Sequence, residues 1–127
     1  MNFWSALSGD DTFSLEVVGI FSCQPELEDL SEGYPEDKEH RNLAILIPEV
    51  DNPYSRTVVR VEIGHRTVGY LSQADAQAFH ASLAKEFSLL SRPRRFRCAA
   101  KIRRATGLGW GGRGYWTVHL DVCLPQA

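Results

Sequence analysis

The sequence predicts a single α+β domain that is mainly β structure, and three observations support this. Runs in which apolar residues alternate with polar ones recur along the chain, as in strands with one buried face. The 127 residues include 10 Gly and 6 Pro, which indicates many turns rather than long helices. Only one long segment, from about Ser72 to Phe87, spaces its apolar residues as a helix does. A chain of this length is expected to bury one hydrophobic core.

The first strand is expected from Phe13 to about Phe21. Phe13, Leu15 and Val17 alternate there with polar residues, which predicts one buried face. Residues 1–12 before it are expected to form an N-terminal tail. The folded domain is therefore predicted to begin at Phe13, and its last predicted strand ends near residue 124.

Residues 25–41 are rich in acidic side chains and are broken by Pro25, Gly33 and Pro35. This composition predicts a solvated surface excursion, in which a helical turn is conceivable only around 26–30. The apolar run at 43–47 that follows is too short for a helix and predicts a core strand.

A β-hairpin and a helix are predicted next. Residues 59–63 and 67–71 alternate as strands on either side of Gly64-His65, and glycine at the first central position predicts a type II′ turn. Ser72 with Asp75 three residues later resembles a capping box, so the helix is expected from about Ser72 to Phe87.

The next predicted strand has a basic face. Its even-numbered residues from Phe96 to Ile102 are apolar or small, and its outward residues are mostly cationic. We call the outward cations the basic row: Arg95, Arg97, Lys101 and Arg103. A closing strand is predicted at 116–124, where apolar residues alternate again.

A glycine-rich loop at 107–114 joins these two strands and carries Trp110 and Arg113. Its glycines match the spacing of a dinucleotide-binding fingerprint, but that motif must open a helix. A strand follows here, so we predict a hairpin loop rather than a nucleotide site.

Charge is distributed unevenly along the chain. The net charge is -2, yet residues 1–51 hold twelve acids and two bases, whereas residues 52–127 hold four acids and twelve bases. The basic half is the electrostatic indication of an anionic partner. The three cysteines are far apart and show no metal-ligand spacing, and no apolar stretch is long enough for a membrane span. We expect a soluble, cytoplasmic protein without a metal or a cofactor.

No catalytic motif is recognisable in the sequence. The four histidines lie at 40, 65, 80 and 119 and none is tied to a nucleophile by a known spacing. We therefore expect the protein not to be an enzyme.

Cations interleaved with aromatic residues favour nucleic-acid binding instead. A charged groove with flat rings is how small barrels hold single strands. The candidate cations beyond Arg95 are Arg97, Lys101, Arg103, Arg104 and Arg113; the candidate rings are Tyr54, Tyr70, Trp110, Tyr115 and Trp116. The alternative is an ordinary solvated sheet face, neutralised by the chain's own acidic segment.

The turn at 50–55 is a further candidate for recognition. Pro53 fixes its own φ and restricts Asn52, so Asn52 and Tyr54 are expected in one rigid, partly exposed geometry. An ordinary connecting turn is the alternative.

In motif order and spacing, the chain resembles the HIRAN domain family over about residues 13–124. The matching pieces are, in order, Val17-Val18-Gly19, Ile47-Pro48-Glu49, Asp51-Asn52-Pro53-Tyr54, Val68-Gly69-Tyr70-Leu71 and Gly114-Tyr115-Trp116 with Asp121.

The resemblance implies a small OB-like β-barrel with one or two helices. It also implies binding of single-stranded DNA or DNA ends in repair or replication, beside helicase or nuclease partner proteins. Asn52 and Tyr54 match positions that contact the terminal nucleotide, and Trp116 matches an aromatic that stacks on a base. Ser55 stands where the family has an aspartate that holds the terminal hydroxyl. Alternation places Trp116 in the core, which makes Tyr115 the outward candidate.

Two functions follow as alternatives. One is a non-catalytic nucleic-acid-binding module. The other is a protein-interaction or regulatory domain with no direct contact to DNA.

Overall fold

The computed structural model describes residues 9–35, 38–49, 52–53, 55–88, 91–92, 94–105 and 114–124. Their elements, in chain order, are β1 (Leu15–Glu16), the 3-10 helix η2 (Ile20–Cys23), α1 (Gln24–Leu30), β2 (His40–Pro48), β3 (Val59–Ile63), β4 (Arg66–Tyr70), α2 (Gln73–Glu86), β5 (Phe96–Ala105) and β6 (Tyr115–Leu120). The structure confirms the predicted class, mainly β with two helices.

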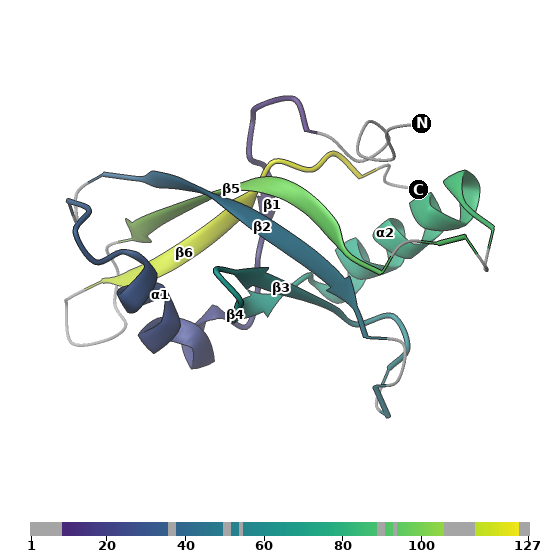
Figure 1. The fold of residues 1–127 in the computed structure, drawn as a ribbon, viewed down its shortest axis with the longest axis horizontal. Helices are drawn as coiled ribbons and strands as arrows, with labels where there is room; N and C mark the ends of the chain where they lie inside the picture. Colours follow the sequence, from purple (N-terminus) through teal and green to yellow (C-terminus); the bar gives the residue numbers. More distant parts are fainter. Residues whose placement is uncertain are drawn as a thin grey trace.

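The strands form one six-stranded antiparallel sheet in the order β1-β6-β5-β2-β3-β4. The sheet curls into a half-barrel, with α1 near the start of β6 and α2 near the start of β5 (Figure 1). Its concave face carries the hydrophobic core, in which Leu46, Phe96 and Ile102 are fully buried. This architecture agrees with the predicted OB-like barrel.

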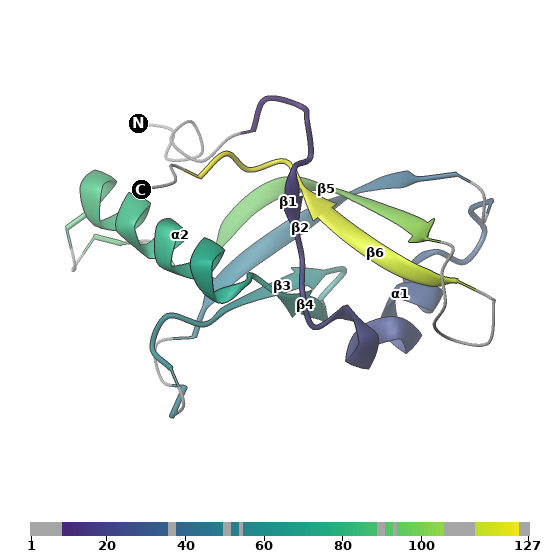
Figure 2. The same cartoon turned by 180° about the vertical axis from the view of Figure 1, so that it is seen from behind.

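The residues after β1 link the two edges of the sheet. The Val17 N–H donates to the carbonyl of Val118 on β6 at 3.0 Å, whereas Val18 exchanges two backbone hydrogen bonds of 2.8 Å with Tyr70 on β4. The chain therefore passes from one edge strand to the other within two residues, and Figure 2 shows it crossing from β6 toward β4. This bridge closes the curled sheet.

Gly69 permits that crossing. A Cβ at Gly69 would lie 2.5 Å from both the Val17 Cγ1 and the Val18 carbonyl oxygen, closer than side chains tolerate. The opposing strand passes too near for any other residue. The glycine of the Val-Gly-Tyr-Leu segment is thus explained by close backbone approach.

The first strand is shorter than predicted. β1 holds only Leu15 and Glu16, because Gly19 adopts a left-handed conformation, φ +73°, and turns the chain into η2. Phe13 is buried as expected but has φ +50° and does not join the core. Its ring lies instead beneath the cations of Arg41 and Lys101, at 5.1 and 4.4 Å.

The predicted hairpin is present, but its turn type was wrong. Gly64 and His65 have φ of +59° and +64°, and two positive values define a type I′ turn rather than type II′. His65 tolerates that conformation at an exposed position. The strand pair β3–β4 also has a bulge opposite Val61 and Glu62.

The helix prediction is confirmed. The Ser72 side chain caps α2 by accepting the Asp75 N–H at 3.1 Å. Ala76, Phe79 and Leu83 form its buried face, and the Phe79 ring packs edge-on against Phe96 at 5.1 Å. None of the helices among the described residues is long and apolar enough to cross a membrane.

Most described residues of the predicted acidic excursion at 25–41 are exposed, but the segment is more structured than expected. It begins inside α1, where Leu27 is fully buried, and Ser31 directly after the helix is also buried. β2 already begins at His40, which is 6% exposed. Most of the acidic side chains are exposed, although Glu26 is half-buried, and Leu27 packs in the core, which a count of charges does not reveal.

Candidate nucleic-acid interface

The basic row lies on the convex face of β5, as alternation predicted. Phe96, Ala100 and Ile102 are buried, whereas Arg97 and Arg103 are exposed. One side of the strand therefore builds the core and the other presents charge.

Two of the predicted cations are used within the fold. The Lys101 side chain is only 21% exposed, and its Nζ lies 3.5 Å from a Glu39 carboxylate oxygen as well as over the Phe13 ring. The Arg104 side chain is 17% exposed and lies 3.6 Å from the Glu28 carboxylate. The acidic segment thus neutralises part of the basic face, as the alternative interpretation held.

Arg97 and Arg103 retain their accessible charge. Neither forms an ion pair with any residue in the described part of the chain. They are six residues apart on one strand, so about 20 Å separates them. They can therefore serve different ligands.

An aromatic pair lies beside Arg103. The ring of Phe21, in η2, is centred 5.1 Å from the ring of Tyr115, on β6, at an interplanar angle of 48°. Phe21 is 52% exposed. The strand register pairs Arg103 with Thr117 and Ala105 with Tyr115, so Arg103 and Tyr115 are diagonal neighbours on the same face.

A groove opens beside Arg103. It has a volume of about 520 Å³ and is lined by Lys38, Glu39, Arg103 and Arg104. Three of the four are cations, which suits a phosphate group better than a neutral ligand. We call Phe21, Tyr115 and Arg103 the Tyr115 cluster.

Trp116 cannot stack on a base as the resemblance implied. It is 2% exposed, its indole N–H donates to Glu28, and its backbone N–H donates to the side-chain oxygen of Gln24 at 2.8 Å. The Gln24 side-chain amide also donates to the Trp116 carbonyl. It therefore makes the two backbone hydrogen bonds that a neighbouring strand would otherwise make with Trp116. Alternation placed Trp116 correctly, in the core.

The turn after β2 is held by its own side chains. The Asn52 amide donates to the Glu49 carboxylate at 3.3 Å, and its oxygen accepts the Ser55 N–H at 3.3 Å. The Ser55 hydroxyl contacts Thr57 at 2.9 Å. Asn52 and Ser55 therefore act first as turn-forming residues. Tyr54 lies outside the described residues.

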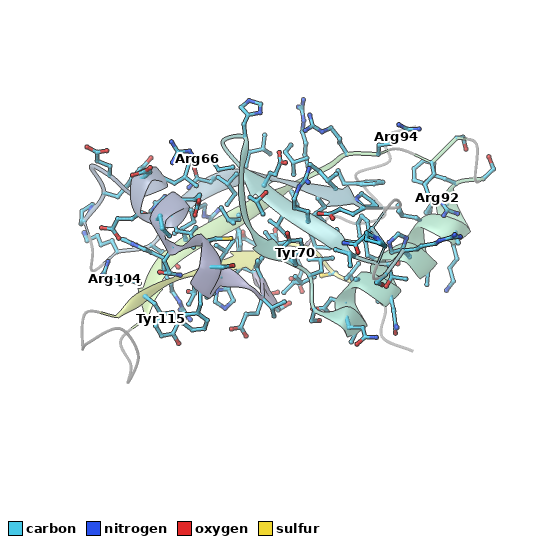
Figure 3. All side chains as sticks on the ribbon, turned by 90° about the horizontal axis from the view of Figure 1, so that it is seen from below. Arg66, Tyr70, Arg92, Arg94, Arg104 and Tyr115 are labelled. Atoms are coloured by element: carbon cyan, nitrogen blue, oxygen red, sulfur yellow. The ribbon has the colours of Figure 1, made fainter. Side chains whose placement is uncertain are left out.

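The candidate residues do not form one site. Asn52 and Ser55 follow the end of β2, whereas Arg103, Arg104 and Tyr115 lie near the level of its start, about 26 Å away along the strand. Figure 3 shows Arg104 and Tyr115 together at one end of the molecule and Tyr70 nearer the middle. Trp110 and Arg113 fall outside the described residues.

Sequence reasoning missed Phe21 and Lys38. The first strand was expected to end near Phe21, but the left-handed turn at Gly19 ends it earlier, and Phe21 lies in η2 with an exposed side chain. Lys38 was hidden among acids. For Phe21, the only available signal was its position just after Gly19, the glycine that ends the first strand.

His40 lies between Ser31 and Asn42 in a chain of hydrogen-bonded side chains. The chain resembles a catalytic Ser-His pair, but its hydrogen bond runs in the opposite direction, from His40 to Ser31. The Asn42 amide lies 2.8 Å from Nδ1, and the Ser31 hydroxyl lies 2.9 Å from Nε2. Because an amide N–H only donates, Nδ1 accepts, and Nε2–H therefore donates to Ser31. His40 cannot remove the Ser31 proton in this tautomer. Burial lowers its pKa from the usual 6.5.

Comparisons with protein-family models, with curated proteins and with solved structures found no match. Within the described residues, no group of three or more His, Cys, Asp or Glu side chains is placed to hold a metal ion. The interpretation of the site therefore depends on its geometry.

Proposed function

We propose that this domain is a non-catalytic module that binds single-stranded DNA, including DNA ends, in repair or replication. The observation that carries the proposal is the Phe21–Tyr115 ring pair beside Arg103, which is exposed and forms no ion pair with any described residue. A partly exposed ring next to an accessible guanidinium offers a stacking surface and a phosphate contact within one nucleotide's reach.

The surrounding charges support a phosphate path rather than a closed pocket. The groove beside Arg103 is open and holds Lys38 and Arg104 as further cations. Phosphate neutralisation releases counterions, so binding at such a groove falls steeply with salt.

Membership of the HIRAN family is part of the proposal. Two of its pieces have clear roles in this fold, because Val17-Val18-Gly19 and the Gly69 segment together close the barrel. Under this proposal Asn52 and Ser55 meet the strand's end, and Ser55 supplies a hydroxyl in place of a carboxylate.

The test is fluorescence anisotropy with labelled single-stranded oligonucleotides at about 50 and 200 mM salt, the range in which phosphate contacts are visible. Oligonucleotides with a free or a blocked 3′ end distinguish general single-strand binding from recognition of the 3′ end. We expect salt-sensitive binding to both and tighter binding to the free end. No binding at the lower salt would overturn the proposal, and binding indifferent to the block would remove end recognition from it.

A further inference from the structure

The convex face of β2 is unusually apolar for a surface that no helix or strand of the described residues covers. Leu43, Ile45 and Ile47 point outward between the buried Ala44 and Leu46. Leu43 is 55% exposed, and Ile45 and Ile47 are half-buried. A solvated sheet face normally carries polar residues at these positions, and apolar residues on both faces are typical of a strand covered on both sides.

The neighbouring strand makes this surface shallow and accessible. The register places Ala99 of β5 opposite Leu43 and Arg97 opposite Ile45. Ala99 is itself exposed, so a small side chain leaves space beside Leu43. We call Leu43, Ile45, Ile47 and Ala99 the β2 stripe.

The exposed charges that β5 places beside the β2 stripe are positive. Arg97 is exposed and has no ion-pair partner in the described part of the chain, and the Arg95 side chain is 62% exposed. The neighbouring acids are paired with Arg60: Glu62, 13% exposed, lies 3.0 Å from Arg60 and 3.7 Å from Arg95, and Glu49, 23% exposed, lies 3.6 Å from Arg60. An incoming ligand therefore meets cations around an aliphatic centre.

We propose that the β2 stripe is a docking surface for an acidic amphipathic helix of a partner protein. Aliphatic side chains favour a protein over a nucleic acid, because they offer no flat ring on which a base can stack. The three outward residues span about 13 Å along the strand, and helix positions i, i+3/i+4 and i+7 span about 10 Å. The partner's carboxylates would meet Arg97 and Arg95.

This surface is distinct from the Tyr115 cluster. Arg97 lies about 20 Å along β5 from Arg103, and the Phe13 ring with Lys101 lies on the same face between the two regions. The two surfaces are therefore centred on different residues, and each can be disabled separately.

The probe is a fluorescein-labelled 18-residue peptide with Leu at i, i+3, i+4 and i+7 spacing and Glu and Gln elsewhere. A peptide of the same composition with the leucines scattered is the control. We expect the wild-type protein to bind the amphipathic peptide at about 50 mM salt and to bind the control at least about tenfold more weakly. No binding, or equal binding of both peptides, would overturn the proposal.

The matched variants are Leu43→Glu and Phe21→Glu, which place the same charge at two exposed apolar positions. Leu43→Glu should weaken peptide binding at least about tenfold while single-stranded DNA binding stays within about twofold, and Phe21→Glu should do the reverse. Equal loss of peptide binding in both variants would contradict the assignment. So would a dimer in sedimentation that Leu43→Glu abolishes, because a second copy would then occupy the stripe. Loss of DNA binding in Leu43→Glu would assign the stripe to nucleic acid instead.

Discussion

The carboxylate of Glu28, on α1, accepts a hydrogen bond of 2.5 Å from the indole N–H of Trp116, on β6. The same carboxylate oxygen lies 3.6 Å from the guanidinium of Arg104, which in turn lies over the Trp116 ring at 5.1 Å. One acidic side chain thus joins α1 to two strands. The part of the acidic segment that forms α1 is built into the fold.

Trp116 should therefore matter for stability and not for binding. Trp116→Phe retains most of the ring volume but loses the bond to Glu28, so we expect it to cost about 1–2 kcal/mol of unfolding free energy. Trp116→Ala should cost about 3–5 kcal/mol, because it also leaves a cavity. Urea unfolding measures both. A folded Trp116→Phe protein that binds single-stranded DNA more than about tenfold more weakly would contradict the structural role.

Gly69→Ala should open the barrel. The added Cβ would meet the Val17 side chain and the Val18 carbonyl at 2.5 Å, so the edge-to-edge bridge must shift. We expect a loss of at least about 3 kcal/mol in thermal or urea unfolding. Gly33→Ala is the matched control, because Gly33 also has a positive φ, +87°, but no atom within 4 Å of the added Cβ. Its expected cost is about 1 kcal/mol. Equal costs would mean that close approach is not what requires Gly69.

Stability should decrease when the pH falls below about 6.5. Burial lowers the pKa of His40, and burial also lowers the pKa of His80 and of His119. The folded state therefore binds fewer protons than the unfolded state between each lowered pKa and 6.5, and the unfolding free energy rises with pH across that window. Protonated His40 would place an N–H donor against the Asn42 amide.

Urea unfolding at several pH values between about 5 and 7.5 checks this dependence. His40→Gln should reduce the slope of the unfolding free energy against pH and leave the part of that slope that His80 and His119 contribute. A slope unchanged by His40→Gln would show that His40 does not titrate in this range.

Local signals in the sequence were sufficient for the β3–β4 hairpin and for α2. The Ser72 cap and the apolar spacing of Ala76, Phe79 and Leu83 act within a few residues, so they can be read without knowing the rest of the fold. The basic row on β5 was also predictable, because alternation alone assigns its face.

The remaining features depend on contacts between distant segments. Nothing near Trp116 in sequence indicates that Glu28 would meet its indole, 88 residues away. The pairing of Lys101 with Glu39 likewise follows from the register of β2 and β5, which charge counting cannot supply. The left-handed conformation at Gly19 ended the first strand early and placed Phe21 in η2, which the alternation of Phe13, Leu15 and Val17 did not indicate.

The central claim is that Arg103 and its aromatic neighbours form the nucleic-acid contact. Arg103→Glu reverses one exposed charge beside Tyr115. Arg94→Glu makes the same change at an exposed position near Arg92, at the other end of the molecule from Arg104 (Figure 3). Both variants shift the net charge equally, so a general electrostatic effect must act on both alike.

The most direct test is therefore the affinity of these two variants for one single-stranded oligonucleotide, titrated by anisotropy from about 50 to 200 mM salt. We expect Arg103→Glu to weaken binding at least about tenfold at the lower salt and to reduce the salt slope by about one, the contribution of one phosphate contact. Arg94→Glu should stay within about threefold of wild type and keep the slope. Equal weakening by both variants, or an unchanged slope in Arg103→Glu, would contradict a specific contact at Arg103.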